Sequence, residues 1–192
     1  MKALKITKDH VNDVIKSITA LVGKRVLVGF PESSSHANRG SEEPTNAALG
    51  YIHEFGSPAA NIPARPFLIP GVEKAEEPGI AMLRKAVEFT LDGKPNHAEE
   101  FLNKAGLLAV NSAKNEISTA SFVPLKPATV RGRKYSRQTK SRRKSEIEYL
   151  RLVKGGMDPG AAQAATGIQP LINTGQLRNA ITYVIRKVRS KA

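Results

Sequence analysis

The sequence predicts an α+β protein in which a small antiparallel sheet packs against one long helix, with extended loops and arms around them. Two β-branched runs near opposite ends of the chain, residues 24–30 and 181–188, are the candidate strands. Between them, residues 96–118 show helical periodicity without a proline, which predicts the longest helix of the chain.

The composition limits the classes of protein to consider. The chain has 192 residues, a net charge of +13 and no cysteine, which excludes disulfides, thiolate metal ligands and thiol nucleophiles. Such an excess of positive charge indicates contact with nucleic acid, an acidic protein surface or an anionic membrane. No apolar run approaches the roughly 20 residues of a membrane span, and the first ten residues lack the apolar core of a signal peptide. We therefore expect a soluble protein made in the cytoplasm, without membrane contact.

The first elements are a helix, a strand and a loop. Residues 8–22 are expected to form an amphipathic helix capped by Thr7 and ended by Gly23, because six aliphatic residues recur at helical spacing. The run KRVLVGF, residues 24–30, is bounded by glycine and proline and predicts a strand. Residues 31–45 are rich in serine, asparagine, glycine and glutamate, which predicts a surface loop.

The central stretch GYIHEFGSPAANIPARPFLIP, residues 50–70, predicts a helix end followed by a stiff, proline-rich arm. Ala48, Ile52 and Phe55 share one helical face, and Gly56 then permits the left-handed φ with which many helices stop. The prolines that follow restrict the chain, so the arm loses less entropy when it becomes ordered. The arm either closes a core or docks on a neighbouring subunit, and its candidate packing residues are Phe55, Pro63, Arg65, Pro66, Phe67 and Leu68.

The next segments predict two helices that pack closely. Residues 72–91 have helical composition, interrupted at Pro78-Gly79, and the second part carries aliphatic residues on one face. Asn96 and Glu99 have the spacing of a capping box at the start of the helix over 96–118. Small residues along that helix would allow another element to approach closely, namely Ala105, Gly106, Ala109 and Ala113.

The last third of the chain contains a basic insertion and a C-terminal helix–strand unit. Residues 122–129 are expected to be extended, and short helices are expected over 146–153 and after Asp158-Pro159. A structural motif, Thr174, Gly175 and Leu177, predicts a short helix capped by Thr174, with Leu177 and Ile181 turned inward. The predicted organisation is a core over 1–120 with its arm at 56–71, a basic extended insertion over 121–168, and a completing unit over 169–192.

The basic block is the strongest chemical signal of the sequence. Eight cations lie within fourteen residues without an intervening acid, so the block repels itself and should bind an anionic partner. Contact with DNA would be sensitive to salt and largely blind to sequence, whereas an acidic protein surface remains the open alternative. The candidate contact residues are Arg131, Arg133, Lys134, Arg137, Lys140, Arg142, Arg143 and Lys144.

No catalytic or metal-binding set emerges from the remaining residues. The four histidines are scattered, without the spacing of a zinc motif, and the adjacent pair His53-Glu54 is more typical of a helix surface than of a metal site. No serine lies in a nucleophile elbow, and no glycine-rich loop has phosphate-binding spacing. We therefore expect no catalytic residue, no metal and no cofactor.

Several motifs, taken in order, carry a resemblance to a known family. They are GYIHEFGSP at 50–58 with IPARPFLIPG at 62–71, PLKPATVRGRK at 124–134, and PLINTGQLRNAITYVI at 170–185, and RVLVGFPE at 25–32 also fits. The chain resembles the neck or tail-completion proteins of long-tailed bacteriophages, a family of small virion morphogenesis or minor tail components. The segment 145–168 and the basic block are additions to that pattern.

The resemblance implies a non-enzymatic virion structural protein that acts in tail completion or in head–tail joining at the neck. It implies an α+β fold, a homo-oligomer that is part of a ring, and neighbours such as a tail terminator, a head-completion protein or portal-side rings. Contact between packaged DNA and the basic block would also fit this location. Two other interpretations remain open: a basic nucleic-acid-binding accessory protein outside the virion, and a basic cytoplasmic enzyme subunit.

Overall fold

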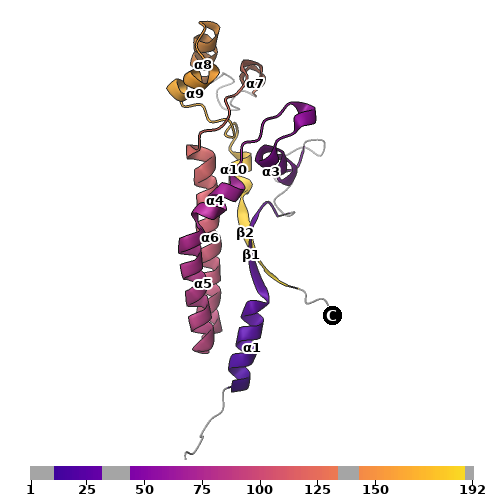
Figure 1. Cartoon of the computed structure of the whole chain (residues 1–192), viewed down its shortest axis with the longest axis vertical. Coiled ribbons are helices and arrows are strands. Elements are labelled where there is room, and N and C mark those ends of the chain that lie inside the picture. The colour runs from indigo at the N-terminus through magenta and orange to yellow at the C-terminus, as the bar shows by residue number, and fades with distance from the viewer. Residues whose placement is uncertain (1–10, 32–43, 134–142, 189–192) are drawn as a thin grey trace, which may run out of the picture.

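The computed structural model describes residues 11–31, 44–133 and 143–188 and shows an α+β fold that is mostly helical (Figure 1). The antiparallel helical hairpin α5–α6 runs along the molecule, with α1 near one of its ends and α8 and α9 at the other. The elements are α1 (Val11–Val22), β1 (Lys24–Gly29), α3 (Asn46–Phe55), the 3-10 helix η1 (Pro58–Ala60), α4 (Leu68–Lys74), α5 (Glu76–Leu91), α6 (Pro95–Thr119), α7 (Pro127–Gly132), α8 (Lys144–Lys154), α9 (Pro159–Thr166), α10 (Gln176–Ala180) and β2 (Thr182–Lys187).

The predicted pairing of the two distant strands is confirmed. β1 and β2 form a two-stranded antiparallel sheet whose register runs from Lys24 opposite Lys187 to Gly29 opposite Thr182. The sheet packs on α6, the long helix, where the ring of Tyr183 lies over Gly106 and its hydroxyl donates a hydrogen bond to Asn103 Oδ1 at 2.9 Å. A Cβ on Gly106 would lie 2.4 Å from that ring, so this glycine allows the strand to approach the helix.

The second close approach on α6 joins it to α4. A Cβ on Gly71 would lie 2.5 Å from Cα and 2.9 Å from the backbone nitrogen of Ala113. These are backbone atoms of the longest helix, so they cannot move aside as a flexible side chain would. The small face predicted for α6 is thus used twice, at Gly106 by the sheet and at Ala113 by α4.

Replacing Gly71 with alanine is expected to lower the free energy of unfolding by about 2–3 kcal/mol, because the added methyl group forces two helix backbones apart. The control is Gly79→Ala in α5, where a Cβ would meet nothing within 4 Å. The free energy of unfolding of that variant should rise by about 0.5–1 kcal/mol, since alanine favours a helix more than glycine does. Urea unfolding followed by circular dichroism measures both, and equal effects of the two changes would contradict the close packing.

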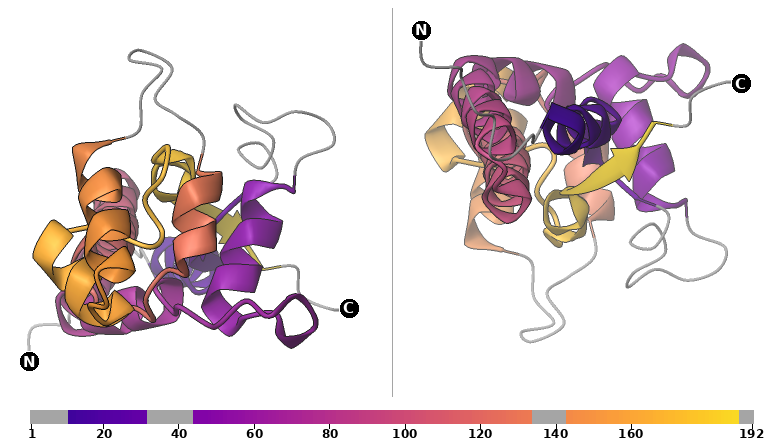
Figure 2. Two further views of the ribbon diagram at one scale, coloured as in Figure 1. Left: turned by 90° about the horizontal axis from the view of Figure 1, so that it is seen from above. Right: turned by 90° about the horizontal axis from the view of Figure 1, so that it is seen from below.

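In the part of the chain that the structure describes, buried apolar side chains form three clusters. The main core gathers around Phe67, Ile117 and Ile181. A smaller cluster joins α5 to α6 through residues such as Leu102. The other cluster, around Tyr149, belongs to α7, α8 and α9. The view from above in Figure 2 shows α8 and α9 over the end of the α5–α6 pair, with α7 between them and α3.

The short helices expected over 146–153 and after Asp158-Pro159 are present as α8 and α9, and with α7 they share their own apolar cluster. The extended conformation expected for 122–129 is wrong from Pro127 onward, where α7 begins, whereas residues 121–126 contain neither helix nor strand.

Several predicted helix boundaries are also corrected. The break between α4 and α5 falls at Ala75, whereas Pro78 lies in the first turn of α5, where its missing N–H costs no hydrogen bond. Helix α6 begins with Pro95 at N1, and its N-cap residue is Lys94, so Asn96 does not form the expected capping box. Helix α7 begins at Pro127, inside the segment expected to be extended. Asp158 does cap α9, accepting hydrogen bonds from the backbone N–H groups of Gly160 and Ala161.

The apolar face that Ala48, Ile52 and Phe55 share is not the face that α3 buries, and Phe55 is not the packing residue expected. Phe55 is 57% exposed and packs against the exposed Tyr51, with ring centroids 4.9 Å apart, and Ala48 is exposed as well. The buried residues of α3 are Asn46, Gly50 and Glu54, which recur every four residues. The apolar periodicity failed here because the helix packs through a glycine beneath Phe30 and through a carboxylate that bonds to backbone.

Two helices leave aliphatic side chains on the surface. No residue of α1 is buried, and Val11, Ile15 and Val22 are exposed although the sequence places them on one apolar face. In α5 the face that carries Leu83 and Leu91 is likewise exposed. The view from below in Figure 2 shows α1 end-on between the α5–α6 pair and β2.

Candidate partner-binding cavity

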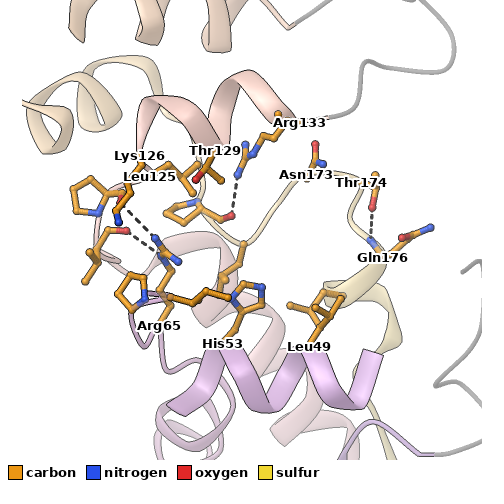
Figure 3. Close-up of a pocket in the computed structure, with 18 of the residues that line it drawn as sticks. Leu49, His53, Arg65, Leu125, Lys126, Thr129, Arg133, Asn173, Thr174 and Gln176 are labelled. Atoms are coloured by element: carbon orange, nitrogen blue, oxygen red, sulfur yellow. Dashed lines mark hydrogen bonds between the residues drawn. The ribbon is translucent and has the colours of Figure 1, made fainter. Parts of the chain in front are cut away.

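The cavity of interest, about 660 Å³ in volume, lies between α3 and the loops that precede α4, α7 and α10 (Figure 3). All the segments that carry the family resemblance, apart from the strand β1, contribute to its wall: His53, Arg65, Leu125, Arg133 and Thr174 come from different segments of the chain. Its volume is within the range of pockets that bind small molecules or short peptide segments.

Glu54 fastens α3 to the start of α4, beside the cavity. Its carboxylate accepts three backbone hydrogen bonds, from the N–H groups of Phe67 and Leu68 to Oε2 at 2.9 and 2.8 Å and from that of Ile69 to Oε1 at 2.9 Å. The first N–H groups of a helix have no partner within the helix, and a buried anion satisfies them. The cap of α4 is thus supplied by a residue of another helix.

Arg65, expected to be a packing residue of the arm, ties the arm to the segment before α7. Its Nε donates to the carbonyl oxygen of Val123 at 3.0 Å and its Nη2 to that of Pro124 at 3.4 Å. Burial, and then the positive charge of Arg133, lower the pKa of Arg65 below its ordinary value. The guanidinium bonds to carbonyl oxygens and contributes positive charge to the cavity wall.

Arg133 makes the corresponding tie on the other side of the cavity. Its Nη2 donates to the carbonyl oxygens of Gln169 and Pro170 at 3.0 and 2.8 Å, and its Nη1 lies 3.5 Å from Oε1 of the buried Glu146. Burial lowers the pKa of Arg133, although Glu146 opposes that shift. Arg65 and Arg133 together join the central arm, the α7 region and the loop before α10.

His53 faces the same cavity from α3 (Figure 3). Among the described residues, its Nδ1 is the one buried side-chain nitrogen or oxygen without a hydrogen-bond partner. Burial, and then the positive charge of Arg65, lower the pKa of His53 below its ordinary value of 6.5. The folded protein therefore holds a neutral imidazole at neutral pH, with one buried, unpartnered nitrogen in a residue that lines the cavity.

The depressed pKa of His53 predicts a loss of stability in acid. Near and below pH 6.5 His53 binds a proton more readily in the unfolded state than in the folded state. The free energy of unfolding should therefore fall as the pH drops through 6.5. The loss should be less than about 1.4 kcal/mol for each pH unit and should level off below the folded-state pKa. Urea unfolding of wild type and His53→Gln from about pH 7.5 to about pH 5 measures it. The same pH dependence in both proteins would contradict the assignment to His53.

The loop before α10 closes the cavity wall. Gly175, with φ 78°, is the N-cap residue of α10, so the expected capping by Thr174 is wrong. Thr174 Oγ1 instead accepts a long hydrogen bond of 3.4 Å from the backbone N–H of Gln176. Leu177 and Ile181 are buried, as predicted.

The structure brings together some of the predicted site residues and separates others. Pro63, Arg65, Arg133, Thr174, Gly175 and Leu177 line the cavity, and Phe67 lies in the main core, whereas Phe55, Pro66 and Leu68 do not line the cavity. Arg143 donates a hydrogen bond to the carbonyl oxygen of Asn173, and Arg131 and Lys144 are exposed. Lys134, Arg137, Lys140 and Arg142 lie outside the described residues.

Sequence reasoning missed Glu54 as a cap and His53 as a cavity residue. Their position in the motif GYIHEFGSP was the available signal, because a polar pair at the end of a helix that precedes a fixed arm can bond to that arm. The described residues contain no group of three or more His, Cys, Asp or Glu side chains placed to hold a metal ion. None of the described helices is both long and apolar enough to cross a membrane.

No protein-family model, curated protein or solved structure matches the chain.

Proposed function

We propose that the protein is a non-enzymatic structural subunit of a long-tailed bacteriophage virion, acting at the neck in tail completion or head–tail joining. In this role it is part of a homo-oligomeric ring and contacts other neck or tail proteins. It is made in the host cytoplasm and ends in the particle. The proposal starts from the resemblance of four ordered segments, residues 50–71, 124–134, 170–185 and 25–32, to proteins of that class.

The observation that carries the proposal is the way these segments converge. Glu54 bonds to the start of α4, Arg65 bonds to the carbonyls of Val123 and Pro124, and Arg133 bonds to those of Gln169 and Pro170. Motifs that are far apart in the sequence thereby form one unit around a cavity. If the resemblance reflects a common architecture, its motifs are expected to contact one another in the folded protein, as these do.

The exposed aliphatic side chains of α1 and α5 also favour a protein that works in an assembly. Exposed apolar surface on a small protein commonly marks a site of protein–protein contact. Val11, Ile15 and Val22 on α1, with Leu83 and Leu91 on α5, are candidates for burial between subunits.

The proposal is tested by locating the protein in purified particles. Particles from cells that encode the chain should contain it, as determined by mass spectrometry, and imaging should place it at the neck or tail end in a ring. The purified full chain should form a closed oligomer in light scattering or negative-stain imaging at high concentration. Particles that lack the protein, together with a monomer that binds duplex DNA in a sequence-dependent manner, would replace the proposal with the accessory-protein interpretation.

Replacing Arg142, Arg143 and Lys144 with glutamine separates a DNA-lining role from docking on acidic subunits. If the basic block binds DNA, the slope of log affinity against log salt should decrease by up to about 0.9 for each duplex phosphate that the variant no longer neutralises. Lysine in place of the two arginines should then leave the affinity for DNA nearly unchanged. If the block instead docks on an acidic protein surface, loss of the bidentate guanidinium should weaken that binding. Filter binding with two unrelated duplexes measures the slopes, and an unchanged slope would exclude the DNA-lining role.

A further inference from the structure

The cavity has three cations on its wall, and no carboxylate is among its described lining residues. The cations are Arg65, Lys126 and Arg133. Glu146 pairs with Arg133 at 3.5 Å but does not line the cavity, and both carboxylate oxygens of Glu54 are occupied by the backbone of α4. A carboxylate entering from another molecule would therefore meet three cations and no carboxylate on the wall itself, although Glu146 behind the wall already pairs with Arg133.

Aliphatic side chains and prolines form much of the remaining wall, together with a few uncharged polar residues. Leu49, Ile62, Val123 and Leu171 contribute aliphatic surface, and apart from the His53 imidazole the described lining contains no aromatic ring on which a nucleobase could stack. The hydrogen bonds of Arg65 and Arg133 to backbone carbonyls fix the wall before any ligand arrives, which reduces the entropy lost on binding.

The third feature that favours a ligand is the unpartnered nitrogen of His53. Its Nδ1 is buried and unpartnered although the residue lines the cavity. A buried polar nitrogen without a partner is costly, and beside a carboxylate ligand it can take up a proton and donate a charge-assisted hydrogen bond. In the view of Figure 3, His53 lies below the cavity, Arg133 above it, and Arg65 and Lys126 on one side.

We infer that this cavity binds an extended peptide of a partner protein in which a carboxylate is flanked by aliphatic side chains. The carboxylate lies among the cations, and its apolar neighbours contact the aliphatic wall. A cavity of about 660 Å³ admits a few residues of extended chain, whereas the backbone of duplex DNA, carried on a wide cylinder, cannot enter it. The inference goes beyond the proposed function and does not depend on where the protein acts.

The test is an NMR titration of the isotope-labelled full chain with a blocked pentapeptide of sequence LDLEL, raised to a few millimolar. Its matched control is LNLQL, which has the same shape without the charges. We expect saturable shifts at cavity residues such as His53, Thr129 and Thr174, and binding at least about tenfold tighter for the acidic peptide. The pKa of His53 should rise when that peptide is bound, because a carboxylate favours the imidazolium.

A charge-reversal variant provides the second part of the test. Lys126 lines the cavity with an exposed side chain, so Lys126→Glu should weaken binding of the acidic peptide by at least about tenfold without unfolding the chain. Lys16→Glu, on exposed α1 near the other end of the molecule, makes the same change in net charge and should leave binding as in wild type.

Three results would overturn the inference. The first is equal binding of the two peptides, and the second is the absence of saturable shifts at the cavity residues. The third is the appearance of those shifts with inorganic phosphate or a short DNA duplex while the acidic peptide produces none, which would make the cavity a phosphate site instead.

Discussion

Replacing Phe67 with alanine is expected to lower the free energy of unfolding by about 3–5 kcal/mol. Phe67 is 0% exposed and lies in the main core with Ile117, Phe122 and Ile181, edge-on to the ring of Phe30 at 6.3 Å. The variant leaves a cavity where the arm, α6 and the C-terminal unit meet, and these elements cannot all collapse to fill it. Of the two roles expected for the arm, closing a core is the one that Phe67 fulfils.

Urea unfolding of the purified full chain measures the loss, and Phe55→Ala is the matched control. Phe55 belongs to the same motif but is 57% exposed, so its replacement should change the free energy of unfolding by less than about 1 kcal/mol. If Phe67→Ala unfolds at the wild-type midpoint, Phe67 does not occupy the core. A loss of assembly by Phe55→Ala without a loss of stability would instead show that Phe55 lies in a subunit interface.

Replacing Glu54 with alanine is expected to lower the free energy of unfolding by about 3 kcal/mol or more, because three backbone N–H groups at the start of α4, one buried and two partly buried, lose a charged acceptor. Glu54→Gln should recover only part of that loss, since the amide retains one acceptor oxygen and places a donor against the remaining N–H groups. The effect should be local at first, with α4 and the arm loosening before the α5–α6 pair does.

Hydrogen exchange combined with urea unfolding measures both the loss and its location. Amides of Phe67, Leu68 and Ile69 should exchange much faster in Glu54→Ala than in wild type. Glu73→Ala serves as control, because Glu73 is an exposed residue of α4, and its replacement should stay within about 0.5 kcal/mol of wild type. Unchanged protection of the three amides in Glu54→Ala would rule out the cap.

The parts of the fold that could be predicted are those in which local pattern and burial agree. The β-branched runs at 24–30 and 181–188 predicted the sheet, and a long stretch of helical periodicity predicted α6 with only small errors at its ends. The small residues of α6 predicted close packing because Gly106 and Ala113 have no bulk with which to hold a neighbour away.

The inward face of α3 and the cavity could not be predicted, because both depend on contacts between distant segments. Glu54 looks like a surface residue until the N–H groups of α4 lie beside it. Arg65 was expected to pack in the arm, but its partners, two carbonyls of the segment before α7, are far away in the sequence. The helices α8 and α9 were expected, but the apolar cluster that they share with α7 was not, because its members come from separate segments around Tyr149, whose hydroxyl donates to the carbonyl oxygen of Leu125.

The pairing of β1 with β2 sets the order in which the protein can fold. Lys24 pairs with Lys187, so the only sheet of the described chain closes a loop that contains nearly every other element. Closing so long a loop costs entropy that nearby contacts must first offset, and contacts of high sequence separation slow folding. On the ribosome, β1 must wait unpaired until the last strand has emerged, while the α5–α6 hairpin can form as soon as it is synthesised. A chain shortened by its final strand should therefore retain the helical hairpin but leave β1 as an exposed, aggregation-prone edge.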